Sequence, residues 1–195
     1  MRWHEYNYYV QSDLYRYCGR KDGASFLKCF ISIPGFKYSF FMRSARYLKS
    51  CGLLLLPCYA ICRLLLDHYQ FKYGMSIPYN TEIGPGLYIG HFGGIIVNSE
   101  AKIGRNCNIN HEVTIGAAYG GKYPGTPIVM DNVYLGPGSK IIGGITLGEH
   151  AAVGANCVVT KSVTDYGVVV GVPGEVVSNK GSGEYVVNTV DCLHA

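Results

Sequence analysis

Two histidines occupy equivalent positions in the chain. His91 follows Ile89 by two residues, and His111 follows Ile109 by two residues. Imidazole is the side chain whose unperturbed pKa lies nearest neutrality, so it is suited to take a proton from a hydroxyl as that hydroxyl attacks an electrophile. The pair beside the Gly93-Gly94 dipeptide therefore predicts a catalytic site. The remaining histidines lack this setting and are interpreted as structural or solvated: His4, His68, His150 and His194.

The element that must position these histidines has a six-residue period. Between residues 77 and 164 an aliphatic residue opens almost every hexad, as in the run Val97, Ile103, Ile109 and Ile115 and the run Val129, Leu135, Ile141, Leu147, Val153 and Val159. Neither a helix nor an open strand produces this spacing, whereas stacked solenoid coils do. We therefore predict a mainly β fold, a left-handed parallel β-helix with a short N-terminal helical segment, which is an exception to the right-handed crossover rule.

Two insertions interrupt the hexads. Two extra residues lie between Ile89 and Val97, so His91 and His111 are one eighteen-residue coil plus two residues apart. Neighbouring coils are about 4.8 Å apart, so the two imidazoles should stack. A second interruption, residues 117–127, also counts as two residues too many and predicts a protruding binding loop. If that loop returns in register, Asp131 joins the two histidines.

The remainder divides into three predicted regions. Residues 1–74 are expected to form an arm, over 1–23, and two helices, one from Pro34 to a stop at Gly52 and one over 53–73. Residues 75–177 are predicted to be the β-helix, and 178–195 a tail.

Composition places the chain among compact proteins without a nucleic-acid partner. It is 48% hydrophobic and 15% charged, and its formal charge of +4 forms no basic stripe with interleaved aromatics. The eight cysteines form no close CxxC pairs and no signal peptide is recognised, which predicts reduced thiols and a cytoplasmic location.

Arg63 interrupts the apolar stretch 53–66, so a packed helix is expected. Peripheral contact with an anionic membrane surface is the open alternative.

The sequence over residues 83–177 resembles the hexapeptide-repeat acyltransferases, and within them the serine acetyltransferase branch. GHFGGIIV at 90–97 is similar to the DHATGIV motif that holds that branch's general base, and VTIG at 113–116 is similar to its VTLG motif. VGANCVVTK at 153–161 and the Gly171-Val172-Pro173 segment resemble the superfamily's closing coil.

This resemblance implies an O-acetyltransferase with His91 as general base and His111 beside it. Acetyl-CoA would be the acyl donor, no metal would be needed, and transfer would be direct within a homotrimer. The implied coenzyme contacts are the small residues at the coil corners and the last coil: Gly116, Ala117, Gly136, Ala155, Thr160 and Lys161.

Departures from the branch determine the expected acceptor. Ser76, Gly90 and Glu112 stand where the serine enzymes are expected to carry two aspartates and a histidine. The helical front resembles that of capsular and exopolysaccharide acetyltransferases. We therefore expect a carbohydrate hydroxyl as acceptor in polysaccharide biosynthesis, bound by Tyr88, Phe92, Glu112 and Asp131.

Three alternatives remain open at this stage. The first is a serine acetyltransferase of cysteine biosynthesis. The second is a zinc hydrolyase of the γ-carbonic anhydrase type, for which His150 would be the third ligand. The third is a solenoid scaffold without catalysis.

Overall fold

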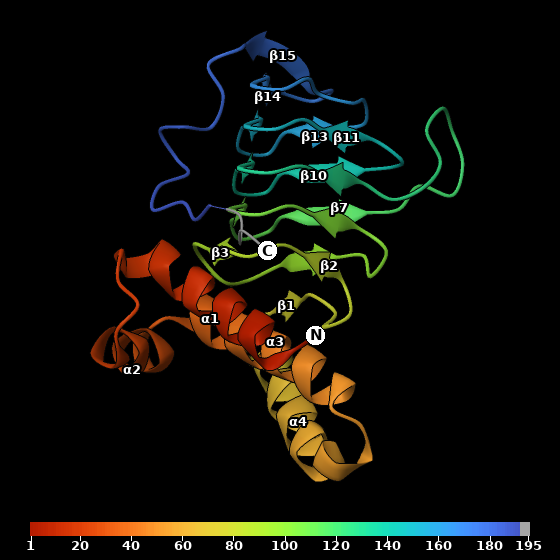
Figure 1. Ribbon diagram of the computed structural model, residues 1–195. Coiled ribbons are helices and arrows are strands. Elements are labelled where there is room, and N and C mark those ends of the chain that lie inside the picture. The colour runs from red at the N-terminus through yellow and green to blue at the C-terminus, as the bar shows by residue number, and fades with distance from the viewer. Residues whose placement is uncertain (192–195) are drawn as a thin grey trace.

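The computed structural model describes residues 1–191, so Cys192 and His194 lie outside the described residues. Its larger part is a stack of coils with three parallel sheets as walls, and helices lie at one end of the stack (Figure 1). Each hexad supplies one short strand. Up to β13 the chain passes in turn through three sheets, here called A, B and C, so each sheet takes every third strand. The last two strands, β14 and β15, extend sheet C. The six-residue period therefore describes a parallel β-helix.

The strands of each sheet follow one another from coil to coil. Sheet A contains β1 (Met75–Ser76), β4 (Ile95–Val97), β7 (Thr114–Gly116), β10 (Lys140–Ile142) and β13 (Val158–Val159). Sheet B contains β2 (Glu82–Ile83), β5 (Lys102–Ile103), β8 (Ile128–Val129) and β11 (Thr146–Leu147). Sheet C contains β3 (Tyr88–Ile89), β6 (Asn108–Ile109), β9 (Tyr134–Leu135), β12 (Ala152–Val153), β14 (Val168–Val170) and the antiparallel β15 (Glu175–Ser178).

The aliphatic residue that opens each hexad points to the axis of the solenoid. Ile109, Leu135 and Val153 are in register on sheet C, and all three are fully buried. Burying such a side chain contributes about 1.5–3 kcal/mol relative to exposure, so each coil is held mainly by its three inward residues. The core of the solenoid is thus the predicted aliphatic stack.

The second insertion is longer than predicted. Val129 pairs with Ile103 on sheet B, not with Ile109 on sheet C. The step from Ile115 to Val129 is therefore one hexad plus an extruded loop of eight residues, rather than two hexads plus two residues. The loop protrudes between β7 and β8 (Figure 1).

The helical region also differs from the prediction. Residues 1–23 were expected to form an arm, but Trp3–Cys18 is helix α1, which ends at Gly19 with the positive φ of 64°. It is followed by α2 (Gly23–Ser32), α3 (Pro34–Ser50), the short 3-10 helix η1 (Leu53–Leu55) and α4 (Leu56–Tyr73). The sequence of α1 shows no clear apolar period, because the buried face of this helix includes the charged residues Asp13 and Arg16 besides Val10 and Leu14.

A buried ion pair attaches the helices to the first coil. Arg43 of α3 contacts Asp13 of α1 at 3.0 Å, and both side chains are 1% exposed. The guanidinium also donates to the carbonyl oxygens of Ile83 and Gly84, and the Asp13 carboxylate accepts from the Leu87 N–H. Burial raises the pKa of Asp13, and Arg43 opposes that rise. Removing either partner of such a pair typically costs about 3–5 kcal/mol, so this junction orients the helices.

The segment after β15 returns along the outside of the solenoid to its first coils (Figure 1). Tyr185 stacks on Tyr134 with ring centroids 4.4 Å apart, and Val190 exchanges hydrogen bonds with Asn106. Among the described residues, no helix is both long enough and apolar enough to cross a membrane.

Candidate active site

The two histidines meet at the corner where the chain passes from sheet C to sheet A, here called the histidine corner. Ile89, Ile109, Leu135 and Val153 are in register on sheet C, so the residues two positions later form a column. From the helical end upward, that column is His91, His111, Pro137 and Ala155. The predicted stacking of His91 on His111 is confirmed by this register.

The two imidazoles contact each other edge to face. Their ring centroids are 5.7 Å apart and the ring planes make an angle of 76°. His91 is exposed and His111 is half-buried, so a substrate would reach His91 first. The Nδ1 atom of His111 is buried and has no hydrogen-bond partner among the described residues.

Close packing between coils shapes the chain around the histidines. A Cβ atom on Gly90 would lie 2.7 Å from the Asn110 Oδ1 atom, and Asn110 is itself held by a hydrogen bond to the Leu135 carbonyl. Gly94 has φ +65°, and its Cβ would lie 3.0 Å from Cγ of Glu112. The backbone N–H of Glu112 donates to the Gly93 carbonyl oxygen at 2.7 Å. A side chain at position 90 would therefore have to displace the Asn110 amide, so the packing of the next coil favours glycine there.

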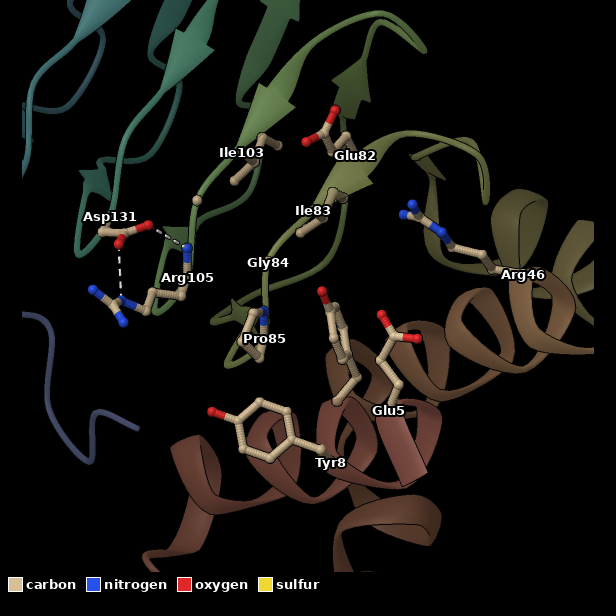
Figure 2. Close-up of a pocket in the computed structure, with 12 residues that line it drawn as sticks. Glu5, Tyr8, Arg46, Glu82, Ile83, Gly84, Pro85, Ile103, Arg105 and Asp131 are labelled. Atoms are coloured by element: carbon tan, nitrogen blue, oxygen red, sulfur yellow. Dashed lines mark hydrogen bonds and ion pairs between the residues drawn. The ribbon is translucent and has the colours of Figure 1, made fainter. Parts of the chain in front are cut away.

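Asp131 does not join the histidine column. Because Val129 lies on sheet B, Asp131 is at the corner between sheets B and C, where its carboxylate pairs with Arg105 at 2.8 Å and accepts from the Arg105 backbone N–H. Figure 2 shows this pair at the edge of a cavity of about 540 Å³, opposite Tyr8 of α1 and Arg46 of α3. The stacking expectation for Asp131 was wrong because the loop extrudes eight residues instead of two.

The other predicted acceptor residues lie on different sides of the histidines. Tyr88 faces the helices, with its ring 4.6 Å from that of Tyr17. Phe92 is exposed beside Tyr73 at the end of α4, with ring centroids 5.5 Å apart. Glu112 is exposed next to His111. Phe92 and Glu112 are thus the acceptor candidates on the open side of this corner.

A second pocket lies at the corner between sheets A and B, here called the loop corner. The protruding loop and the last coil enclose a cavity of about 320 Å³, lined by Ala118, Gly120, Gly121, Lys122, Tyr123, Ile142, Thr160 and Lys161. Lys161 also pairs with Glu175 at 3.3 Å, and both side chains are 65% exposed. The structure therefore brings two predicted coenzyme contacts, Thr160 and Lys161, beside the predicted binding loop.

The remaining predicted coenzyme contacts are dispersed. Gly116 and Ala117 begin the loop and are half-buried, whereas Ala155 is exposed in the histidine column. Gly136 is buried, and a Cβ atom there would lie 2.6 Å from the Val153 carbonyl oxygen. Packing alone accounts for glycine at position 136.

Sequence reasoning missed Ile142 as a residue of the loop pocket. The available signal was the coil length, because Ile142 precedes Thr160 by eighteen residues and so occupies the same place one coil earlier. The width of sheet A separates this pocket from the histidines by about 10–15 Å, and Thr160 also lies three coils above His91, so these two residues are on the order of 20 Å apart.

The third histidine of the hydrolyase alternative lies elsewhere. His150 stacks on Tyr166, with ring centroids 4.8 Å apart, at the corner between sheets B and C. Over residues 1–191, no group of three His, Cys, Asp or Glu side chains is placed to hold a metal ion.

Comparisons with known proteins support the hexapeptide-repeat solenoid. A family model described as bacterial transferase hexapeptide (six repeats) matches residues 126–161. A serine acetyltransferase of Staphylococcus xylosus is 37% identical over 125 residues, which cover 63% of this chain and 57% of that protein. Soybean serine acetyltransferase, as apoenzyme, is 30% identical with a TM-score of 0.72, covering 89% of this chain and 69% of that one. The chain belongs to the hexapeptide transferases, on their serine acetyltransferase-like branch.

This hexapeptide transferase also resembles a solved complex. The structure of Brucella abortus serine acetyltransferase in complex with coenzyme A has a TM-score of 0.71 at 25% identity, covering 91% of this chain and 68% of that one. These likenesses support the expected left-handed β-helix with N-terminal helices. The chain spans less than two thirds of the length of the curated relatives it matches, 57% in the case of the Staphylococcus xylosus protein.

Proposed function

We propose that this hexapeptide transferase is an acetyl-CoA-dependent O-acetyltransferase in which His91 is the general base. The observation that carries the proposal is the pair of contacting imidazoles, one exposed, at a corner of the solenoid. The coenzyme A complex of a similar solenoid supports acetyl-CoA as the donor.

In the proposed reaction, His91 takes the proton of the acceptor hydroxyl while the hydroxyl oxygen attacks the thioester carbonyl carbon. A tetrahedral intermediate forms, and its oxyanion needs a donor such as a backbone N–H of the glycine-rich corner. The carbon–sulfur bond then breaks, the leaving thiolate of coenzyme A receives the proton held by His91, and the acetyl ester remains on the acceptor. His111 would hold the His91 ring by the edge-to-face contact.

Donor binding is assigned to the loop corner. Lys161, a point charge on a flexible stem, would reach a phosphate of the coenzyme, and the loop would enclose its pantetheine arm with Thr160. Because sheet A separates this pocket from His91, one solenoid supplies only one wall of a groove that includes both. We therefore propose a homotrimer in which neighbouring solenoids complete the groove.

L-serine is the acceptor that the comparisons favour, because the similar proteins are described as serine acetyltransferases. They offer no support for the expectation of a role in capsule or exopolysaccharide synthesis. O-acetylation of L-serine is accordingly the first activity to test.

A carbohydrate hydroxyl is the second candidate, and the packing at Gly90 favours it. An amino-acid zwitterion needs charged groups to hold it, and position 90 carries glycine, crowded by the Asn110 amide, in place of the aspartate that the resemblance expects. Ser76 and Glu112 likewise replace an expected aspartate and histidine. Phe92 offers an exposed aromatic face that suits a sugar ring.

Steady-state kinetics decide between these acceptors. Release of the coenzyme A thiol from acetyl-CoA would be followed with L-serine at millimolar concentration and with a panel of mono- and oligosaccharides. Efficient formation of O-acetylserine supports the first candidate, and turnover with a sugar alone supports the second. If purified protein binds acetyl-CoA but no hydroxyl acceptor stimulates thiol release above the level of a His91→Asn variant, the proposed activity is wrong.

A further inference from the structure

Helix α4 carries its apolar stripe on the outside of the molecule. Amphipathic helices of globular proteins normally turn such a stripe toward the core. In α4 and the preceding η1, Leu54, Ile61, Leu64 and Phe71 are seven, three and seven residues apart, which places them on one helical face, and they are 90%, 61%, 71% and 82% exposed. The opposite side of α4 packs into the protein through Cys62 and Leu66. Figure 1 shows α4 at the end of the molecule away from the solenoid, so neighbouring elements leave this stripe uncovered.

The N-terminal segment that contains this helix carries most of the positive charge of the chain. Residues 1–74 contain eleven Lys and Arg against four Asp and Glu, whereas residues 75–195 contain six against nine. Asp67, the acidic residue of α4, is paired with Arg63 at 2.9 Å. Lys49 lines a small pocket with Leu53 and Leu56, at the start of the stripe. Lys72 follows Phe71 in the chain, so a lysine lies near each end of the stripe.

We propose that this outer face of η1 and α4 docks onto the surface of an anionic lipid bilayer. A bilayer interface accepts a helix whose apolar side chains insert among the acyl chains while its Lys and Arg side chains reach the anionic headgroups. Arg63, Asp67 and Lys72 lie within the helix, which suits a position in the interface plane rather than in the hydrocarbon interior. A second copy of the chain fits this face less well, because pairing two such faces would bring two positively charged segments together. The inference does not depend on the proposed catalytic activity.

Vesicle sedimentation of the full chain tests the proposal. The wild-type protein should sediment with vesicles of phosphatidylcholine and phosphatidylglycerol, and much less with phosphatidylcholine alone. Binding should fall as salt is added, because the electrostatic part of the attraction is screened. The double variant Ile61→Asn, Leu64→Asn should partition about tenfold or more weakly, since two inserted aliphatic side chains are lost.

A matched control replaces two apolar side chains that are also exposed but lie in β15 and in the segment that follows it. Val177 and Val187 are 62% and 56% exposed, and the double variant Val177→Asn, Val187→Asn should bind anionic vesicles like the wild type. Unchanged thermal unfolding of both double variants shows that folding is intact.

Three results would overturn the proposal. One is a wild-type protein that stays in the supernatant with anionic vesicles, and another is equal binding by both double variants. The third is a lower molecular mass of the Ile61, Leu64 variant in light scattering without any change in vesicle binding, which would identify the face as a contact between copies.

Discussion

The two corners that border sheet A are built from the same repeating turn, yet Gly90 beside His91 is crowded by the next coil, whereas Gly120 and Gly121 in the protruding loop are open. At the histidine corner, a Cβ atom on Gly90 would lie 2.7 Å from Asn110, one on Gly94 would lie 3.0 Å from Glu112, and one on Gly136 would lie 2.6 Å from Val153. At the loop corner, Gly120 has no atom within 4 Å of the position where its Cβ would be. A general base must be held in position by the residues around it. A long, flexible donor is enclosed more easily by a loop that protrudes from the solenoid. We therefore expect substitutions at the histidine corner to affect turnover and stability, and those at the loop corner to affect donor binding.

The largest expected effect follows from His91→Asn. Loss of a positioned base typically lowers turnover by about two to four orders of magnitude, so kcat should fall by that range while acetyl-CoA still binds. Steady-state kinetics measure the first quantity, and isothermal titration calorimetry with acetyl-CoA measures the second. Because His91 is exposed, its replacement should leave thermal unfolding unchanged. Near wild-type turnover on the true acceptor would remove His91 from the role of base.

His111→Asn should reduce kcat less, by roughly ten- to a hundredfold, because His111 acts on the reaction through its contact with the His91 ring. The shape of the pH–rate profile should remain that of the wild type, since the base is unchanged. A loss as large as that of His91→Asn, together with loss of the limb attributed to the base, would instead make His111 the base.

Glycine substitutions compare the packing of the two corners directly. Gly90→Ala should lower the free energy of unfolding by about 1–3 kcal/mol, the usual range for overpacking, because Asn110 is held by its hydrogen bond to the Leu135 carbonyl. Gly120→Ala is the matched control, and its effect should be within about 0.5 kcal/mol. Urea denaturation followed by circular dichroism gives both values. Equal stabilities would show that the next coil does not crowd position 90.

The smallest expected effect belongs to Lys161→Ala, which should weaken acetyl-CoA binding roughly tenfold, about 1.4 kcal/mol. Lys102 is the control because it also sits in a coil and pairs with a carboxylate, that of Glu82, with a 60% exposed side chain. Titration calorimetry should show wild-type affinity for Lys102→Ala. If the two variants bind acetyl-CoA alike, Lys161 is a solvated surface charge and the coenzyme lies elsewhere.

The six-residue repeat explains why the solenoid and the contact between His91 and His111 could be predicted from the sequence. The six-residue period places each inward aliphatic residue, and the two-residue insertion after Ile89 leaves His91 one coil below His111. Both facts depend only on counting along a regular solenoid. The count failed for Asp131, because residues 117–127 include a protruding loop. The sequence of this segment does not indicate how many of its residues belong to the loop and how many to the coil.

The sequence by itself therefore determined the coil, its core and the contact between His91 and His111, since each coil depends only on its neighbours. Tertiary structure alone decided how the helices attach to the first coil. Asp13 and Arg43 are thirty residues apart, and the sequence does not distinguish a buried charged residue on a helix from a solvated one. The tertiary structure also decided that the Asn110 amide crowds position 90 and that the stripe of α4 faces outward. Those properties depend on which distant segments occupy the neighbouring space, and no period in the chain specifies that.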